Sequence, residues 1–381
     1  MLIYLVVFFF SILFTYIAER SIAKNRKQFI AFSVLSVGLP VLLSGLRDNS
    51  VGTDTEGYVA WVWNIVSRCS DWDSFLHLYH GGYFADIEFG YLMVNFVANV
   101  FSNDVHSVYF LTGLLSILPI YIAIYHYRAK VPMWLSMAIF LLTYYNLSLN
   151  LTRQSIALAF CIYAFRYVEQ RRWFKLVVMF IVILGFHNTG FIFIPAVVMF
   201  LLMEHLRWRG KIIFLLACFV SLMIAFRYVD VLLFASVTYG LLPEKFLYYQ
   251  IDEMTGFLSR SNFIVYIFES LLMLMVILSR ASRKMKSRLF SYFTLKCIGV
   301  YSFTLSTLSM WAFRISYYFN FPADCLFLPS SLNTLRQNGK TNLYRWSLVL
   351  LISLLLFNWY FNIVIKNANE TYPYKSSILG I

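Results

Sequence analysis

Apolar runs of about 20 residues recur along the whole chain, and this pattern limits the possible folds more than any other feature. Because a lipid bilayer offers the backbone no hydrogen-bond partners, such runs cross it as helices. Of the 381 residues, 60% are hydrophobic and only 13% are charged, about half the charged share of an ordinary soluble domain. The sequence therefore predicts an all-α, polytopic bundle of membrane helices. It excludes a disordered chain and argues against a cytosolic enzyme.

The positions of the basic residues predict the orientation of this bundle. Six loops carry about two thirds of the 31 lysine and arginine residues, with only three acids. Basic loops stay in the cytoplasm, so the positive-inside rule assigns all six to that side. The net charge of +13 is then a signal of membrane topology and does not indicate nucleic-acid binding. The six loops are residues 19–27, 126–130, 166–175, 204–211, 280–288 and 331–345.

Between an outer helix end and a cytoplasmic loop the chain must cross the membrane an odd number of times. Applied along the chain, this condition predicts about 12 spans, with both termini outside. Two apolar stretches, residues 88–101 and 231–242, are too short to cross and are predicted to be partial helices at the outer face. The chain is then one integral membrane domain with outer loops at residues 47–105 and 228–261. The predicted spans are residues 2–18, 28–46, 106–125, 132–149, 153–168, 173–187, 190–203, 211–227, 262–278, 289–311, 314–330 and 346–365.

Ionisable and polar side chains gather at the outer ends of several predicted spans. The positive-inside rule concerns only the basic loops, so it does not by itself require these side chains to lie on the same side of the membrane. We therefore expect a site for chemistry at the outer face. The candidate residues are Arg47, Asp54, Tyr58, Glu88, Arg153, Gln154, His187, Arg314 and Tyr317.

Arg153 has the clearest physical logic, because it lies in the first turn of a predicted helix whose N-terminus points outward. Unpaired N–H groups and the positive end of the helix dipole meet there, and a guanidinium adds two parallel donors. This combination is typical of a pyrophosphate site, although an arginine here could also anchor the helix to lipid headgroups. His187 is a candidate general base near neutral pH, and Asp54 and Glu88 are candidate bases or ligands of sugar hydroxyls. A solvated loop carboxylate and a histidine bonded to a carbonyl group are the structural alternatives.

Other polar and aromatic residues leave two interpretations open. Glu269, Lys296 and Asp324 fall inside predicted spans, where ionisable groups are functional candidates, but a polar contact between helices explains them equally well. Tyr144 and Tyr145 lie near an outer end and favour an interfacial aromatic belt, with sugar stacking as the alternative. The five cysteines form no CxxC pair and predict neither a disulfide framework nor a metal site.

The order of several short motifs resembles that of the EpsG family, over nearly the whole chain. The family's opening motif, its E-x-G-Y element, its R-Q-x-x-A helix start, its F-H pair, its late R-x-x-x-Y element and its C-terminal tail all have similar segments here. After the histidine the family usually has serine or another small residue, where this chain has Asn188. The similar segments are Arg47 with Val51-Gly52-Thr53-Asp54-Thr55 and Tyr58, Glu88-Phe89-Gly90-Tyr91, Arg153-Gln154-x-x-Ala157, Phe186-His187, Arg314 with Tyr317-Tyr318-Phe319, and Tyr372-Pro373-Tyr374.

This resemblance implies a Wzy-type polymerase of O-antigen, capsule or exopolysaccharide repeat units, with a GT-C-like fold in the bacterial inner membrane. The implied enzyme is a glycosyltransferase that moves a glycan from undecaprenyl pyrophosphate to a lipid-linked acceptor repeat unit at the periplasmic face. The implied partners are this lipid-linked oligosaccharide, membrane lipid, a chain-length regulator and a flippase, and nucleic acid is not among them.

The same resemblance implies roles for the candidate residues. Arg47, Arg153 and Arg314 would hold the pyrophosphate, with Gln154, Tyr58 and Tyr317 as further substrate contacts. His187 is the first choice for the base, followed by Asp54 or Glu88. No cofactor is expected, because arginines can replace a divalent metal ion at the leaving group.

Two other functions remain open from the sequence. A lipid-linked oligosaccharide flippase also has about 12 spans, but it should line a central cavity with polar residues at mid-depth. Here only Glu269, Lys296 and Asp324 lie deep, and the candidate site residues lie together at the outer face, which favours an enzyme. An O-antigen ligase or another transferase of the same topology is the second alternative.

Overall fold

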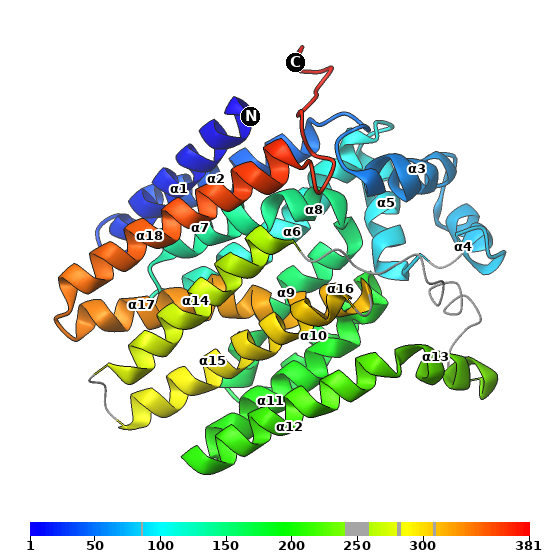
Figure 1. Ribbon diagram of the computed structural model, residues 1–381. Coiled ribbons are helices and arrows are strands. Elements are labelled where there is room, and N and C mark those ends of the chain that lie inside the picture. The colour runs from blue at the N-terminus through cyan, green and yellow to red at the C-terminus, as the bar shows by residue number, and fades with distance from the viewer. Residues whose placement is uncertain (85–86, 241–258, 280–282, 308–309) are drawn as a thin grey trace. The chain divides into compact units, whose positions relative to one another are not determined.

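The computed structural model describes residues 1–84, 87–240, 259–279, 283–307 and 310–381, in which the regular structure is helical and no β-strand occurs. The chain folds into two compact units, labelled by helix in Figure 1. The first comprises Met1–Phe193 with Leu348–Ile381, and the second comprises Ile194–Ser347. Hydropathy along the sequence did not predict this division.

The first unit is built from helices that pack pairwise, with α1 against α2 and α7, α2 against α6, and α6 and α10 against α9. Short helices follow α2 and lead to α5. The bounds are α1 (Leu2–Ser21), α2 (Arg26–Gly45), the π-helical turn η1 (Thr55–Val59), α3 (Ala60–Val66), α4 (Trp72–His80), α5 (Phe89–Phe101), α6 (His106–His126), α7 (Met133–Thr143), α8 (Tyr145–Asn150), α9 (Thr152–Glu169), α10 (Trp173–Phe186) and the 3₁₀ turn η2 (Asn188–Ile192). The chain returns to this unit in α18 (Thr341–Trp359) and the π-helical turn η7 (Tyr360–Ile365).

In the second unit, α15 packs against α12, α14 and α16, and α17 packs against α14. A π-helical turn, η6, follows Pro322 directly. The bounds are α11 (Phe193–His205), α12 (Trp208–Arg227), α13 (Val229–Thr238), α14 (Arg260–Leu278), α15 (Arg283–Thr304), the 3₁₀ turn η5 (Leu305–Thr307), α16 (Met310–Pro322), η6 (Ala323–Phe327) and α17 (Leu328–Gln337).

Seven helices among the described residues are long and apolar enough to cross a membrane. The predicted spans 28–46, 106–125 and 262–278 correspond closely to α2, α6 and α14. The expected number of about 12 is not confirmed, because several predicted spans are interrupted or short. Residues 132–149 divide into α7 and α8 at Tyr144, α10 has 14 residues, and residues 314–330 change to a π-helix after Pro322. The seven are α1, α2, α6, α12, α14, and the continuous stretches Asn188–His205 and Thr341–Ile365.

The two predicted partial helices are short helices in the structure. Residues 88–101 contain α5, with 13 residues, and residues 231–242 overlap α13, with 10 residues; residues 241–242 lie outside the described ranges. Neither is long enough to cross a bilayer. Their position at the outer face stays a prediction.

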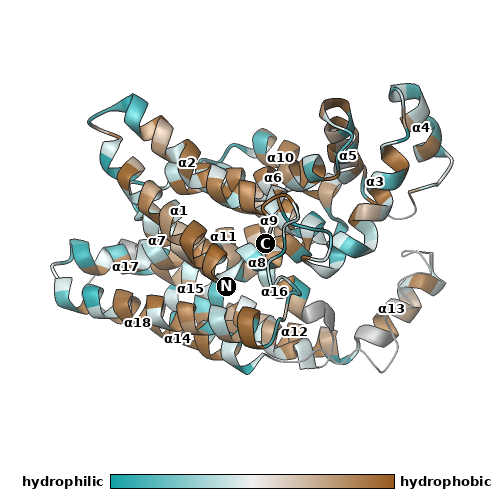
Figure 2. Ribbon diagram, turned by 90° about the horizontal axis from the view of Figure 1, so that it is seen from above, coloured by the Kyte–Doolittle hydropathy of each residue, from teal (hydrophilic) through white to brown (hydrophobic). Residues whose placement is uncertain are grey.

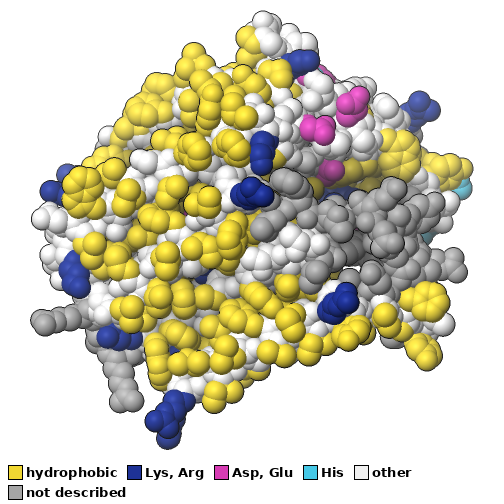
Figure 3. Space-filling model, in the orientation of Figure 1, with side chains coloured by type: hydrophobic (Ala, Val, Ile, Leu, Met, Phe, Trp, Pro, Cys, Tyr) yellow, Lys and Arg dark blue, Asp and Glu magenta, His cyan; other side chains and the backbone are white. Residues whose placement is uncertain are grey.

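Large apolar side chains lie on the surface of both units. Figure 2 shows helices that are mainly hydrophobic, joined by hydrophilic turns, and Figure 3 shows hydrophobic side chains over most of the face in view. In α12 only 11% of the most apolar 18 residues are buried, and in α1 the share is 28%. A soluble protein would not leave such helices in water, so these surfaces fit contact with lipid.

An aromatic cluster joins the two ends of the chain within the first unit. Tyr4 and Phe8 of α1 pack edge-on against Tyr145 and Trp359, with ring centres 5.3 to 6.3 Å apart. Tyr145 is fully buried and donates to the Pro40 carbonyl oxygen at 2.8 Å. The interfacial belt expected here is therefore wrong for Tyr145, which packs inside the protein. The same prediction is wrong for the neighbouring Tyr144, which is 1% exposed.

The C-terminal tail packs against the end of α2. The Tyr374 hydroxyl donates to the Leu43 carbonyl oxygen at 2.8 Å. The backbone N–H and hydroxyl of Ser377 both donate to Asp48 Oδ1, each at 2.8 Å. These hydrogen bonds, the backbone one first, lower the pKa of Asp48. The tail thereby fixes the start of the segment that follows α2.

A buried ionic cluster links three elements of the second unit. Lys296 of α15 lies 2.5 Å from Glu269 Oε2 in α14 and 2.5 Å from Asp324 Oδ1 in η6. All three side chains have no exposed surface, and the Lys296 ammonium also lies 4.3 Å from the centre of the Tyr266 ring. The structure thus shows a polar contact between helices, which was one of the two interpretations of these residues. Removing the lysine would leave two buried carboxylates without a cation.

We predict that Lys296→Met lowers the free energy of unfolding by about 3–5 kcal/mol, the cost of an unpaired buried charge. The triple variant Lys296→Met/Glu269→Gln/Asp324→Asn should recover part of this loss, because no charge is left unpaired. Thermal unfolding in detergent measures both, with the exposed Lys27→Met as the control. A Lys296→Met variant as stable as this control would contradict the structural role.

Candidate functional site

A buried arginine anchors the segment after α2. Arg47 is 1% exposed and donates to the carbonyl oxygen and hydroxyl of Ser44, at 3.1 and 2.7 Å, and to Thr55 Oγ1 at 3.4 Å. Its guanidinium lies 4.7 Å from the centre of the Tyr109 ring. Among the described residues no carboxylate forms an ion pair with it. Neutral groups alone therefore hold a full positive charge inside the first unit.

Gly52 brings this segment against the start of α9. Its φ is +95°, a conformation that side chains rarely adopt, and an added Cβ would lie 2.7 Å from a carbonyl oxygen of α8. Two residues later, the Asp54 backbone N–H donates to Asn150 Oδ1 at 3.2 Å. These contacts place Asp54 and Tyr58 beside the N-terminus of α9, where Arg153 lies.

An ion pair joins the starts of three helical segments. Arg153, in the first turn of α9, donates through one terminal nitrogen to Oε2 of Glu88, which immediately precedes α5. The other oxygen, Oε1, accepts the backbone N–H of Asn188 at 3.0 Å, and Asn188 begins η2. A carboxylate is favourable at helix N-termini, so both its charge and its position fit. The Glu88 side chain is 8% exposed and that of Arg153 is 20% exposed, which leaves the guanidinium partly open to solvent.

Tyr58 lies against the Arg153 guanidinium, with 4.4 Å between the guanidinium carbon and the ring centre. Its hydroxyl accepts the Arg153 backbone N–H at 3.4 Å, and its ring packs edge-on against Tyr91 at 5.7 Å. Burial, and then the Asp54 carboxylate, raise the pKa of Tyr58 well above its usual value, while Arg153 acts in the opposite direction. Tyr58 therefore stays a neutral phenol near pH 7. We call Tyr58, Glu88, Arg153 and Asn188 the Glu88–Arg153 centre.

His187 caps the turn that supplies Asn188. Its Nδ1 accepts the Thr189 backbone N–H at 3.1 Å and lies 2.8 Å from Thr189 Oγ1. Because an accepting nitrogen carries no proton, the proton of the neutral ring lies on Nε2. Nδ1 is therefore already occupied by Thr189, which argues against removal of a proton by this nitrogen.

A close approach of two backbones holds the Glu88 and Asn188 segments together. A Cβ added to Gly90 would lie 2.5 Å from the carbonyl oxygen of Gly185, so α5 and α10 touch directly at this point. Gly90 comes two residues after Glu88, and Gly185 comes three residues before Asn188. The glycine of the E-x-G-Y element thus has a packing reason.

Several predicted site residues meet within the first unit. Glu88, Arg153 and Tyr58 are in contact, with Asp54 and His187 on the adjoining segments. Gln154 is only 2% exposed. Arg314 and Tyr317 belong to α16 of the second unit, so their grouping with Arg153 stays a prediction.

Sequence reasoning missed the two asparagines of the site. Asn150 orients Asp54, and Asn188 supplies a backbone N–H to Glu88. Asn188 stood out only as a departure from the family pattern. Because the contact uses its backbone, any residue except proline can make it, and the departure leaves the contact intact.

The comparison with protein families fits this arrangement. The model of the EpsG family matches residues 30–376, nearly the whole chain. The chain belongs to the EpsG family. EpsG is a Wzy-type polymerase family, and this membership supports a polysaccharide-polymerase type of role in general terms. No curated protein and no solved structure matches this EpsG-family chain.

We predict that Gly90→Ala destabilises the protein by about 1–3 kcal/mol, because its methyl group overpacks the backbone of α10. The matched control is Gly185→Ala on the other side of the same contact, where an added Cβ meets no atom within 4 Å. This control should be neutral or more stable, since alanine favours a helix over glycine. Thermal unfolding compares the two, and equal effects would contradict the close approach.

Proposed function

We propose that this protein polymerises lipid-linked oligosaccharide repeat units at the periplasmic face of the bacterial inner membrane. The glycan on undecaprenyl pyrophosphate is the donor, and a hydroxyl of a second lipid-linked unit is the acceptor. The observation that carries the proposal is the Glu88–Arg153 centre, because it joins the separate motifs of a polymerase family around one partly exposed guanidinium.

The chemistry requires positive charge at the leaving group. The acceptor oxygen forms a bond to the anomeric carbon, the bond from that carbon to the pyrophosphate oxygen breaks, and the electron pair leaves with the pyrophosphate. Donors aimed at the developing charge lower the barrier. We assign Arg153 to the pyrophosphate, with Arg314 as a second ligand. Arg47 is buried, so we assign it a supporting role through its uncompensated charge and its contact with Thr55.

The acceptor hydroxyl must also lose its proton. Glu88 accepts from both Arg153 and Asn188, so we assign it to positioning the arginine rather than to proton transfer. His187 comes second as a base, because its Nδ1 already accepts the Thr189 backbone N–H. Asp54, next to Tyr58, is then our preferred base, and His187 is the alternative.

The deep charges favour an enzyme over a flippase. A flippase needs polar groups that line an open path at mid-depth. Glu269, Lys296 and Asp324 are the ionisable residues expected deep in the bundle, and they are fully buried and paired with one another. This argument supports the transferase within the described part of the chain.

A deletion strain complemented with variants tests the proposal. We predict that Arg153→Ala abolishes long surface chains and leaves single repeat units at the surface, as seen on a polysaccharide gel. The matched control is Arg68→Ala, an exposed arginine of the same predicted outer loop, which should restore the full ladder. Immunoblotting shows that both variants accumulate.

Three results would refute the assignment. A normal ladder with Arg153→Ala would remove the arginine from the site. Loss of every surface unit in the deletion strain, with lipid-linked units trapped inside, would indicate a flippase. Long chains that stay on the lipid carrier in the deletion strain would indicate a ligase.

A further inference from the structure

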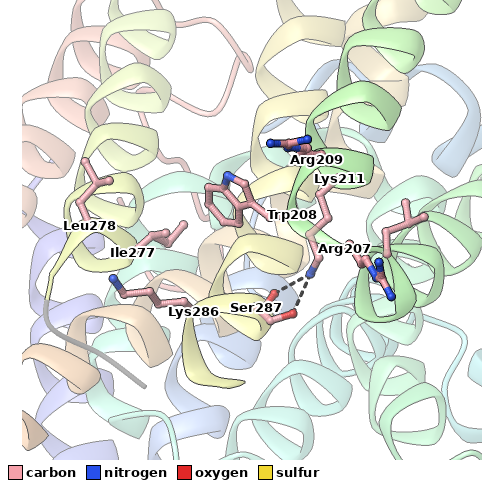
Figure 4. A pocket seen from close by; sticks show the side chains of 9 residues that line it. Arg207, Trp208, Arg209, Lys211, Ile277, Leu278, Lys286 and Ser287 are labelled. Atoms are coloured by element: carbon pink, nitrogen blue, oxygen red, sulfur yellow. Dashed lines mark hydrogen bonds between the residues drawn. The ribbon is translucent and has the colours of Figure 1, made fainter. Parts of the chain in front are cut away.

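A cavity of about 920 Å³ lies within the second unit, where the N-terminus of α12 meets the end of α14 and the start of α15. Figure 4 shows its side chains around a common space, with Trp208 between Ile277 and Lys211 in this view. The size is sufficient for a polar headgroup. The Glu88–Arg153 centre lies in the first unit, so this cavity is not part of it.

The lining of this cavity is basic. Arg207, Arg209, Lys211 and Lys286 contribute four cations, and among the described residues no acid lines it. Lys211 is 1% exposed and is held by Ser287, whose carbonyl oxygen and hydroxyl accept from it at 3.0 and 2.8 Å.

Three of these cations remain available to a ligand. Arg207, Arg209 and Lys286 form no ion pair with any described carboxylate. The Glu204 carboxylate has a favourable electrostatic interaction with Lys211, and Glu204 does not line the cavity. The positive charge is therefore uncompensated where the space is open. These cations lie at separate points around the cavity (Figure 4), so an anionic group that occupies it meets positive charge from several sides.

Exposed apolar side chains surround the cavity. They favour a lipid as the ligand over a soluble phosphate compound, which has no apolar part to bind them. Trp208 and Leu278 line it and are 50% and 72% exposed. From this point α12 continues with exposed Ile213, Leu216 and Val220, and little of its apolar surface is covered. Tryptophan at the end of such a helix is typical of the headgroup level of a bilayer.

We propose that this cavity binds the phosphate of an anionic phospholipid. The headgroup lies against Arg207, Arg209 and Lys286, and the acyl chains run along the exposed face of α12. Both loops that supply the cations, residues 204–211 and 280–288, are predicted to be cytoplasmic. Basic pockets between membrane helices on that side are suited to anionic headgroups.

Native mass spectrometry of the full-length protein in detergent tests this proposal. Phosphatidylglycerol and phosphatidylcholine with the same acyl chains are added separately. The variant Arg207→Gln/Arg209→Gln/Lys286→Gln should bind phosphatidylglycerol about a hundredfold more weakly, since each of the three basic residues near an anionic headgroup contributes about 1 kcal/mol. Its binding of phosphatidylcholine should not change, which also shows that the variant is folded.

The matched control removes three exposed cations elsewhere, Lys24→Gln/Arg26→Gln/Lys27→Gln in the turn between α1 and α2. It should keep its preference for phosphatidylglycerol. Equal loss in both triple variants, or no loss in either, would overturn the proposal. Arg209→Gln alone, which should lose part of the preference, replaces the first triple variant if that variant does not fold.

A second arm distinguishes the lipid from a free phosphate. Inorganic phosphate and glycerol phosphate, at the concentration of the lipid, should not displace phosphatidylglycerol. If they do displace it, the cavity belongs to a soluble phosphate compound, and the assignment to lipid is wrong.

Discussion

The ion pair between Glu88 and Arg153 is the contact on which the candidate site depends. It joins residues 65 positions apart in the chain, and the second oxygen of Glu88 brings in a third segment through Asn188. A single carboxylate thus sets the relative positions of the starts of α5, α9 and η2. A guanidinium has five N–H donors, so Arg153 can bind a pyrophosphate through its remaining donors while Glu88 holds it in position.

The segment between α2 and α3 supports this contact from one side. It is tied to the C-terminal tail by hydrogen bonds to Asp48 and Gly52, and to α8 by the Asn150 side chain. Tyr58 at its end then packs against Arg153. The C-terminal tail therefore helps to hold the segment that carries Tyr58, although the tail supplies no residue to the Glu88–Arg153 centre itself.

The helical class, and the meeting of Glu88, Arg153 and Tyr58, could be predicted from the sequence. Apolar runs specify membrane helices, and the positive-inside rule predicts that Glu88, Arg153 and His187 lie on the same side of the membrane. The break at Tyr144 could not be predicted, because hydropathy continues across it, whereas Pro322 is itself a signal for an interruption that hydropathy does not register. The partners of Glu88 and the burial of Arg47 also depend on how helices pack, which the order of motifs does not contain.

Reconstitution of the purified protein in liposomes tests the central claim most directly. The liposomes carry one defined repeat unit on undecaprenyl pyrophosphate, and chain length and free undecaprenyl pyrophosphate are measured over time. A polymerase should lengthen the chains and release one undecaprenyl pyrophosphate for each linkage formed. Movement of the repeat unit across the bilayer with no linkage formed would contradict the account.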